Sequence, residues 1–179
     1  MSRVITFSTV FPSYHPRKGE PTYFVEKLIT SLVVNEVKGY YTTTLKDCRD
    51  KGILKISNLD DWQKGHTIRA GHRWKVGDWF SPRVWSGKPY QTPMIIIGPD
   101  IQIKKIFNFQ LRWVPEANMN MYGFINDQLI DNPTALRLAH NDGLTLEDFE
   151  DWFKPKQKLQ KSLTAFDGQI LVWNENINY

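Results

Sequence analysis

Cysteine is almost absent from this chain, since Cys48 is the only one among its 179 residues. A single cysteine excludes an intramolecular disulfide and a zinc site built from paired cysteines. Long apolar runs are also missing: no segment has the length of a membrane span, and residues 1–7 lack the features of a signal peptide. These absences predict a cytoplasmic protein that has no membrane partner.

Apolar and aromatic residues, in contrast, are plentiful. Hydrophobic residues make up 41% of the chain and aromatic residues 13%, which is typical of globular proteins. A length of 179 residues suits one domain with a substantial core. The formal net charge of +4 and the pI near 9.1 suit a ligand that carries phosphates, but the excess is small for a protein that coats nucleic acid.

Three segments carry helix signals. Apolar residues recur every four positions from Phe24 to Leu32, the stripe of an amphipathic helix. Asn132 is expected to cap a second helix, which ends at Asp142. Thr145 stands three residues before an acid, the spacing of a capping box, and therefore predicts a third helix.

Strand signals fill most of the remaining chain. Runs of β-branched and aromatic residues between turn residues predict strands at residues 4–11, 53–56, 67–69, 79–85, 94–97, 101–111, 118–125 and 169–173. One helix after the first strand, then mostly strands, then two helices and a closing strand favour an α+β fold. Short strands without regular β-α alternation favour a small partly closed β-barrel with flanking helices over a doubly wound sheet.

Charged, hydroxyl and imidazole side chains are concentrated between Gln63 and Asp78. Residues three apart on a regular strand point to opposite faces. Lys64 and Thr67 can therefore meet only if Gly65 forms a turn or a bulge between them. With Arg69, these residues form the candidate site.

The spacing of Lys64, Thr67 and Arg69, followed by Gly77-Asp78, resembles the motif of the ASCH domains, which are relatives of the PUA RNA-binding fold. A later feature of that family is an acidic residue just before a short helix, and Asp142 matches it. Together the two pieces cover roughly half of the chain. The resemblance implies a β-barrel with flanking helices and a cleft for RNA or a modified nucleoside.

The resemblance also implies roles for individual residues. In the small bacterial members that remove an acyl group from N4-acylated cytidine, the motif Lys, the motif Thr and the later acid are the proposed catalytic set. Position by position these are Lys64, Thr67 and Asp142. The acid in those hydrolases is Glu, so the shorter Asp142 requires the backbone to lie closer.

The chain is also much longer than those hydrolases. We expect residues 1–179 to form a single ASCH-like domain with an elaborated N-terminal region, and the ligand to be changed or larger.

Further residues are expected to bind the ligand. Aromatic and basic residues interleave from residue 73 to residue 90, a mixture that single-stranded RNA binding uses for stacking and phosphate neutralisation. Arg69 is expected either to hold a phosphate or to pair with Asp142. Trp85 and Tyr90 are expected to be exposed, because their loop is rich in turn residues. The ligand-binding set is Arg69, His66, Arg73, Arg83, Trp85, Lys88 and Tyr90.

Three functions stay open on the sequence. They are a hydrolase of N4-acylated cytidine, a non-catalytic RNA-binding module, and an ASCH-type ribonuclease in which His66 or His72 supplies a base. His66, His72 and His140 do not share the helical i, i+4 spacing, so no metal site is expected, and no cofactor is expected either. The sequence leaves the ligand and the oligomeric state open.

Overall fold

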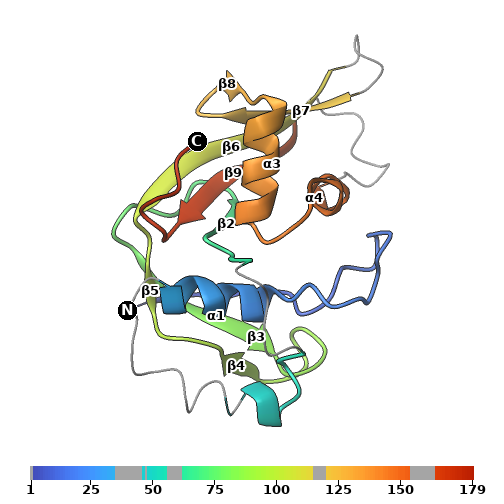
Figure 1. The fold of residues 1–179 in the computed structure, drawn as a ribbon, viewed down its shortest axis with the longest axis vertical. Coiled ribbons are helices and arrows are strands. Elements are labelled where there is room, and N and C mark those ends of the chain that lie inside the picture. The colour runs from blue at the N-terminus through green and yellow to red at the C-terminus, as the bar shows by residue number, and fades with distance from the viewer. Residues whose placement is uncertain (1, 35–45, 47, 56–61, 115–119, 154–163) are drawn as a thin grey trace.

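The computed structural model describes residues 2–34, 46, 48–55, 62–114, 120–153 and 164–179. The fold is α+β, as the sequence predicts, and its strands form two sheets (Figure 1). Among the described strands no hydrogen-bonded ladder joins one sheet to the other. The expected barrel is therefore not closed, and the two sheets are held together by side-chain packing.

The first sheet surrounds β3 (Trp79–Trp85). β1 (Arg3–Thr6) pairs with it in parallel, and β4 (Met94–Ile96) and β5 (Ile101–Gln102) pair with it antiparallel. Proline lacks the N–H that a central strand donates, so Pro82 predicts an edge strand or a bulge, but β3 is central. A central position is possible because the neighbouring strand on one side of β3 changes from β5 to β4 beside Pro82. The N–H that proline lacks therefore falls between the β3–β5 ladder and the β3–β4 ladder.

The second sheet is antiparallel throughout, in the order β2-β9-β6-β7-β8. Its strands are β2 (His66–Ala70), β6 (Lys105–Val114), β7 (Asn120–Ile125), β8 (Gln128–Leu129) and β9 (Thr164–Val172). The single strand expected at residues 101–111 is divided between the two sheets. Its first part is β5 and its second part is β6, and Ile103 between them donates its N–H to Asp78 O at 2.9 Å.

Three helices have bounds within the described residues: α1 (Phe24–Val34), α3 (Asn132–Asn141) and α4 (Leu146–Phe153). The cap of α3 is Asp131, one residue before the expected Asn132, because the Asp131 carboxylate accepts the N–H of Thr134 at 2.9 Å. At α4 the Thr145 hydroxyl accepts the N–H of Asp148 at 3.1 Å, as the capping-box spacing predicts.

Other sequence expectations have mixed outcomes. The first strand ends at Thr6 rather than at residue 11, and Val10 instead forms an isolated bridge with Pro21. Residues 53–55 of the strand expected at 53–56 belong to no strand. Residue 56, residues 118–119 and the basic segment at 154–161 lie outside the described residues.

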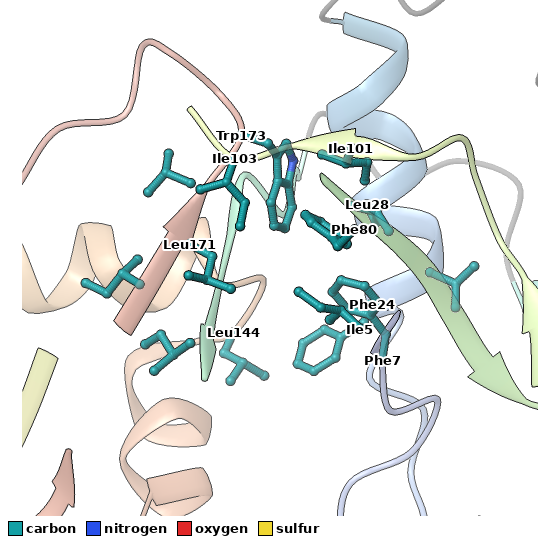
Figure 2. Packing of buried hydrophobic residues seen from close by; sticks show 14 of the residues in the cluster. Ile5, Phe7, Phe24, Leu28, Phe80, Ile101, Ile103, Leu144, Leu171 and Trp173 are labelled. Carbon is teal, nitrogen blue, oxygen red and sulfur yellow. The ribbon is translucent and has the colours of Figure 1, made fainter. Parts of the chain in front are cut away.

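The core lies between the two sheets. Leu28 of α1 and Phe80 of β3 pack opposite Leu171 of β9, and Trp173 sits beside Phe80 with its ring centroid 5.7 Å away (Figure 2). Trp173 Nε1 also donates to Ser31 Oγ of α1 at 3.1 Å. Within the described part of the chain, no helix is long and apolar enough to cross a membrane.

Candidate functional site

A cavity of about 510 Å³ opens where the two sheets and α4 meet. Its lining comes from both sheets, the β3–β4 loop, α1 and α4, so distant parts of the sequence contribute to it. The lining residues are Thr6, Phe7, Ser8, Thr9, Val10, Phe24, Lys64, Thr67, Ile68, Arg69, Trp85, Gly87, Pro89, Tyr90, Asp142, Trp152, Phe153 and Phe166. The three residues matched to the family's catalytic set therefore share one cavity.

Lys64 and Asp142 form a buried ion pair at the wall of this cavity. Lys64 Nζ donates to Asp142 Oδ1 at 2.5 Å and also to the backbone carbonyl of Asp142. Lys64 is 1% exposed and Asp142 is 6% exposed. The ammonium also lies 4.2 Å from the ring centroid of Phe24. The pair is thus enclosed by protein, with the cavity as its opening.

Two backbone contacts hold Lys64 in place. Its N–H donates to Lys27 O of α1 at 3.0 Å, and the N–H of Gly65 donates to Asn141 O, at the end of α3, at 2.9 Å. The sequence predicts a turn or a bulge at Gly65; in the structure Gly65 has no positive φ and lies just before β2. Lys64 instead precedes the first residue of β2, so strand alternation does not govern its direction.

Asp142 reaches Lys64 because α3 ends there. Asp142 is the C-cap of α3, and its N–H donates to Leu138 O at 3.0 Å. The next residue, Gly143, has φ of +82°, the left-handed conformation that glycine adopts without steric cost at a helix end. The helix end thus brings the acid near Lys64 although its side chain is shorter than Glu.

Lys27 adds a second buried ammonium beside the pair. Its Nζ donates to Gly143 O at 2.6 Å and lies 3.6 Å from the ring centroid of Trp62. Burial, reinforced by the nearby charge of Lys64, lowers the pKa of Lys27 from 10.5 to about 8. Sequence reasoning missed this residue, because a lysine on an amphipathic helix is normally assigned to the solvent-exposed face.

Burial moves the pKa values of the ion pair in opposite directions. Desolvation raises the pKa of Asp142 and lowers the pKa of Lys64, while the attraction between the two groups opposes both shifts. Arg69 adds another cation, since burial lowers its pKa only to about 10. At neutral pH the cluster of Lys27, Lys64, Arg69 and Asp142 therefore carries more positive than negative charge, which favours an anionic ligand group.

Thr67 and Arg69 are both on β2 and both line the cavity, as strand alternation predicts for residues two apart. Thr67 is buried and pairs with Leu171 of β9. The guanidinium of Arg69 donates to Thr6 O at 2.9 Å and lies 5.5 Å from the ring centroid of Phe7. Arg69 Nε is buried without a hydrogen-bond partner in the described part of the chain.

His66 lies behind the ion pair and does not line the cavity. The Tyr179 hydroxyl accepts the Asn141 amide at 3.0 Å and lies 2.6 Å from His66 Nδ1, so its proton is directed to that nitrogen. His66 Nε2 then carries the ring proton and faces Asp142 Oδ1 at 3.7 Å. Burial keeps the pKa of His66 well below 6.5, so the ring is neutral.

The expected ligand-binding residues separate into two groups. Trp85 and Tyr90 line the cavity with Arg69. Arg83, Lys88 and Arg73 do not line it: Arg83 Nε donates to Ser81 Oγ at 3.3 Å, Lys88 is exposed on the neighbouring loop, and Arg73 borders a separate hollow with Trp74. His72 is also away from the cavity and pairs with Asp167 at 3.1 Å.

Sequence reasoning also missed an aromatic wall of the cavity. Its members come from α1, α4 and β9, and they are Phe24, Trp152, Phe153 and Phe166. Phe24, Trp152 and Phe153 are spaced like the residues on the buried face of an amphipathic helix, so the sequence predicts them as core residues. The wall gives the cavity an apolar surface beside its charged residues.

The described residues contain no group of three or more His, Cys, Asp or Glu side chains that could hold a metal ion. The site is therefore characterised by its buried ion pair, its threonine and its aromatic wall. Neither the protein-family models, nor the curated proteins, nor the solved structures compared with the chain give a match.

Proposed function

We propose that the chain is an ASCH-type domain whose cavity binds a modified cytidine, free or within RNA, and hydrolyses its N4-acyl amide. The observation that carries this proposal is the convergence of Lys64, Thr67 and Asp142 on one cavity of about 510 Å³. Small-molecule sites typically enclose about 300–1,000 Å³. The cavity is thus large enough for a base with an acyl group.

The proposed chemistry assigns one role to each residue. The Thr67 hydroxyl attacks the amide carbonyl, the bond from carbon to N4 breaks, and water then releases the acyl group from Thr67 as a carboxylic acid. Asp142 takes the hydroxyl proton and delivers it to the N4 amine of the leaving cytidine. Lys64 stabilises the negative oxygen that forms at the carbonyl, an interaction that burial strengthens.

The charges and the aromatic wall support the same class of ligand. Excess positive charge from Lys64, Arg69 and Lys27 favours a phosphate or a developing oxyanion. Aromatic rings from α4 and β9 offer faces on which a planar base can stack. A ribonuclease is not favoured, because neither His66 nor His72 lines the cavity.

Thr67→Val gives the sharpest test, because valine keeps the shape of the side chain and removes only the hydroxyl. With N4-acetylcytidine as substrate, we expect wild-type protein to release acetate. We expect Thr67→Val to lower kcat/KM by about 10²-fold to 10⁴-fold, and Thr67→Ser to retain part of the activity. Acetate release and circular dichroism measure activity and folding on the same samples.

Lys64→Met and its control complete the test. Removing one partner of a buried ion pair costs about 3–5 kcal/mol of stability, so only Lys64→Met protein that is shown to be folded is assayed. Lys104→Met is the control, because Lys104 is on the surface and outside this cavity. A wild-type protein that is inert towards every acylated cytidine would reject the hydrolase, and binding without hydrolysis would identify a binding module.

A further inference from the structure

The loop between β3 and β4 contains a tight turn with an unusual residue at its corner. The N–H of Gln91 donates to Lys88 O at 3.2 Å, closing a turn with Pro89 and Tyr90 at its two central positions. Tyr90 has φ of 64°. A proline followed by a residue with positive φ is the pattern of a type II turn, in which Gly or Asn is normally found at the second position.

Neither the turn nor the core accounts for a tyrosine at this position. Positive φ is unfavourable for a residue that carries a Cβ atom, so Gly would suit the turn better. The side chain gains no burial in exchange, because Tyr90 is 90% exposed. A strained residue with an exposed aromatic ring points to a role in binding.

The position of the ring indicates what it binds. Tyr90 and Trp85 both line the cavity, and their ring centroids are 5.2 Å apart at an interplanar angle of 51°. Tyr90 is therefore at the mouth of the cavity, next to the position of a bound ligand. Most of its ring surface stays free for a second planar group outside the cavity.

The charge around the turn favours a polyanion. Residues 79–99 include two basic side chains, Arg83 and Lys88, and no acidic one. Lys88 is exposed and lies two residues before Tyr90. Exposed aromatic rings next to basic residues are the combination that holds single-stranded nucleic acid, with bases stacked on the rings and phosphates near the cations.

We propose that Tyr90 is a stacking platform for the base adjacent to the one in the cavity, so that the ligand is a single strand of RNA rather than a free nucleoside. This inference rests on the proposed function for the occupant of the cavity. Tyr90 is then a specificity-determining residue. It selects a substrate base that has a neighbour in the strand.

The test compares binding of two probes by the same protein. One probe is N4-acetylcytidine, and the other is a short single-stranded RNA that contains one N4-acetylcytidine. We expect wild-type protein to bind the RNA more tightly, and Tyr90→Gly to weaken RNA binding about tenfold or more, since stacking on an aromatic side chain contributes that much per base. Tyr90→Phe keeps the ring and should keep the affinity.

The glycine variant separates binding from folding. Gly relieves the positive φ, so Tyr90→Gly is expected to unfold at the same temperature as wild type or higher. Trp79→Ala is the matched control, because Trp79 is a half-exposed ring at the start of β3, the strand that leads into the Tyr90 loop, and does not line this cavity. Its RNA affinity should equal that of wild type.

Two results would overturn the inference. One is equal binding of RNA and nucleoside by wild type, and the other is RNA binding that Tyr90→Gly leaves unchanged. These outcomes are distinct from failure of the proposed hydrolysis, because affinity is measured with inactive Thr67→Val protein as well. If RNA binding depends on Tyr90 but wild-type protein releases no acetate, the hydrolase is rejected and the role of Tyr90 as a stacking platform is supported.

Discussion

At the scale of single residues, the ion pair between Lys64 and Asp142 is difficult to explain by stability. Both side chains are almost fully buried, so each loses the hydration of its charge. Apolar residues of similar volume often stabilise a core as well as a buried ion pair does or better. Buried charged groups that border a cavity, despite the cost of losing their hydration, are typical of functional sites.

Lys27 provides a prediction about pH. Its pKa in the folded protein is about 8, below the ordinary 10.5, so between these values the unfolded chain holds a proton that the folded chain has released. Rising pH in this window therefore favours the folded state, and the contribution is lost as the pH falls through 8. We expect the free energy of unfolding to rise with pH in wild type relative to Lys27→Met.

Urea unfolding at several pH values across this window measures the difference. Lys104→Met serves as the control, because Lys104 is a surface residue paired with Glu175 at 3.5 Å and should follow wild type. A wild-type curve parallel to that of Lys27→Met would contradict the lowered pKa.

The sequence predicts only part of the site, for a physical reason. Lys64 and Thr67 are close in the chain, and their spacing with Arg69 is visible as a motif. Phe166 and Lys27 reach the site through sheet pairing and helix packing, which no local pattern encodes. His66 belongs to the motif region, but the contact with Tyr179 holds it away from the cavity.

At the scale of elements, the pairing of β9 with β2 requires the two backbones to lie very close together at Gly168. A Cβ atom at Gly168 would lie 2.2 Å from the carbonyl oxygen of Arg69 on β2. The neighbour is backbone that is held in the β2–β9 ladder, so it has little freedom to move. We expect Gly168→Ala to lower the free energy of unfolding by about 3 kcal/mol or more, measured by urea unfolding.

Gly65→Ala is the matched comparison. A Cβ atom at Gly65 would lie 2.4 Å from Cδ1 of Ile177, the flexible end of a side chain that can rotate away. We expect a cost of about 1–2 kcal/mol. An equal or smaller cost for Gly168→Ala would show that β2 and β9 can separate locally.

Element types are easier to predict than the partners of the strands. Residues 101–111 have the composition of one long strand. The chain nevertheless passes from one sheet to the other near Ile103, whose N–H pairs with Asp78 O while the N–H of Lys104 pairs with Val172 O. A passage between sheets is determined by distant partners, so the local sequence predicts strand without predicting its division.

At the scale of the whole molecule, the two sheets share one core. The cluster of buried apolar residues includes Phe80 of the first sheet, Leu171 of the second and Leu28 of α1. The cavity also draws its walls from both sheets. Separation of the sheets would therefore expose the core and dismantle the site together.

This shared core predicts one cooperative unfolding transition, as the expectation of a single domain requires. Trp173→Phe is the most informative change, because it removes the hydrogen bond to Ser31 and part of the packing against Phe80. We expect it to lower the free energy of unfolding by about 1–3 kcal/mol while the transition stays single. Tryptophan fluorescence, far-ultraviolet circular dichroism and calorimetry should report the same midpoint. Two separated transitions, in wild type or in the variant, would mean that the sheets unfold as independent units and that the cavity lies between two domains.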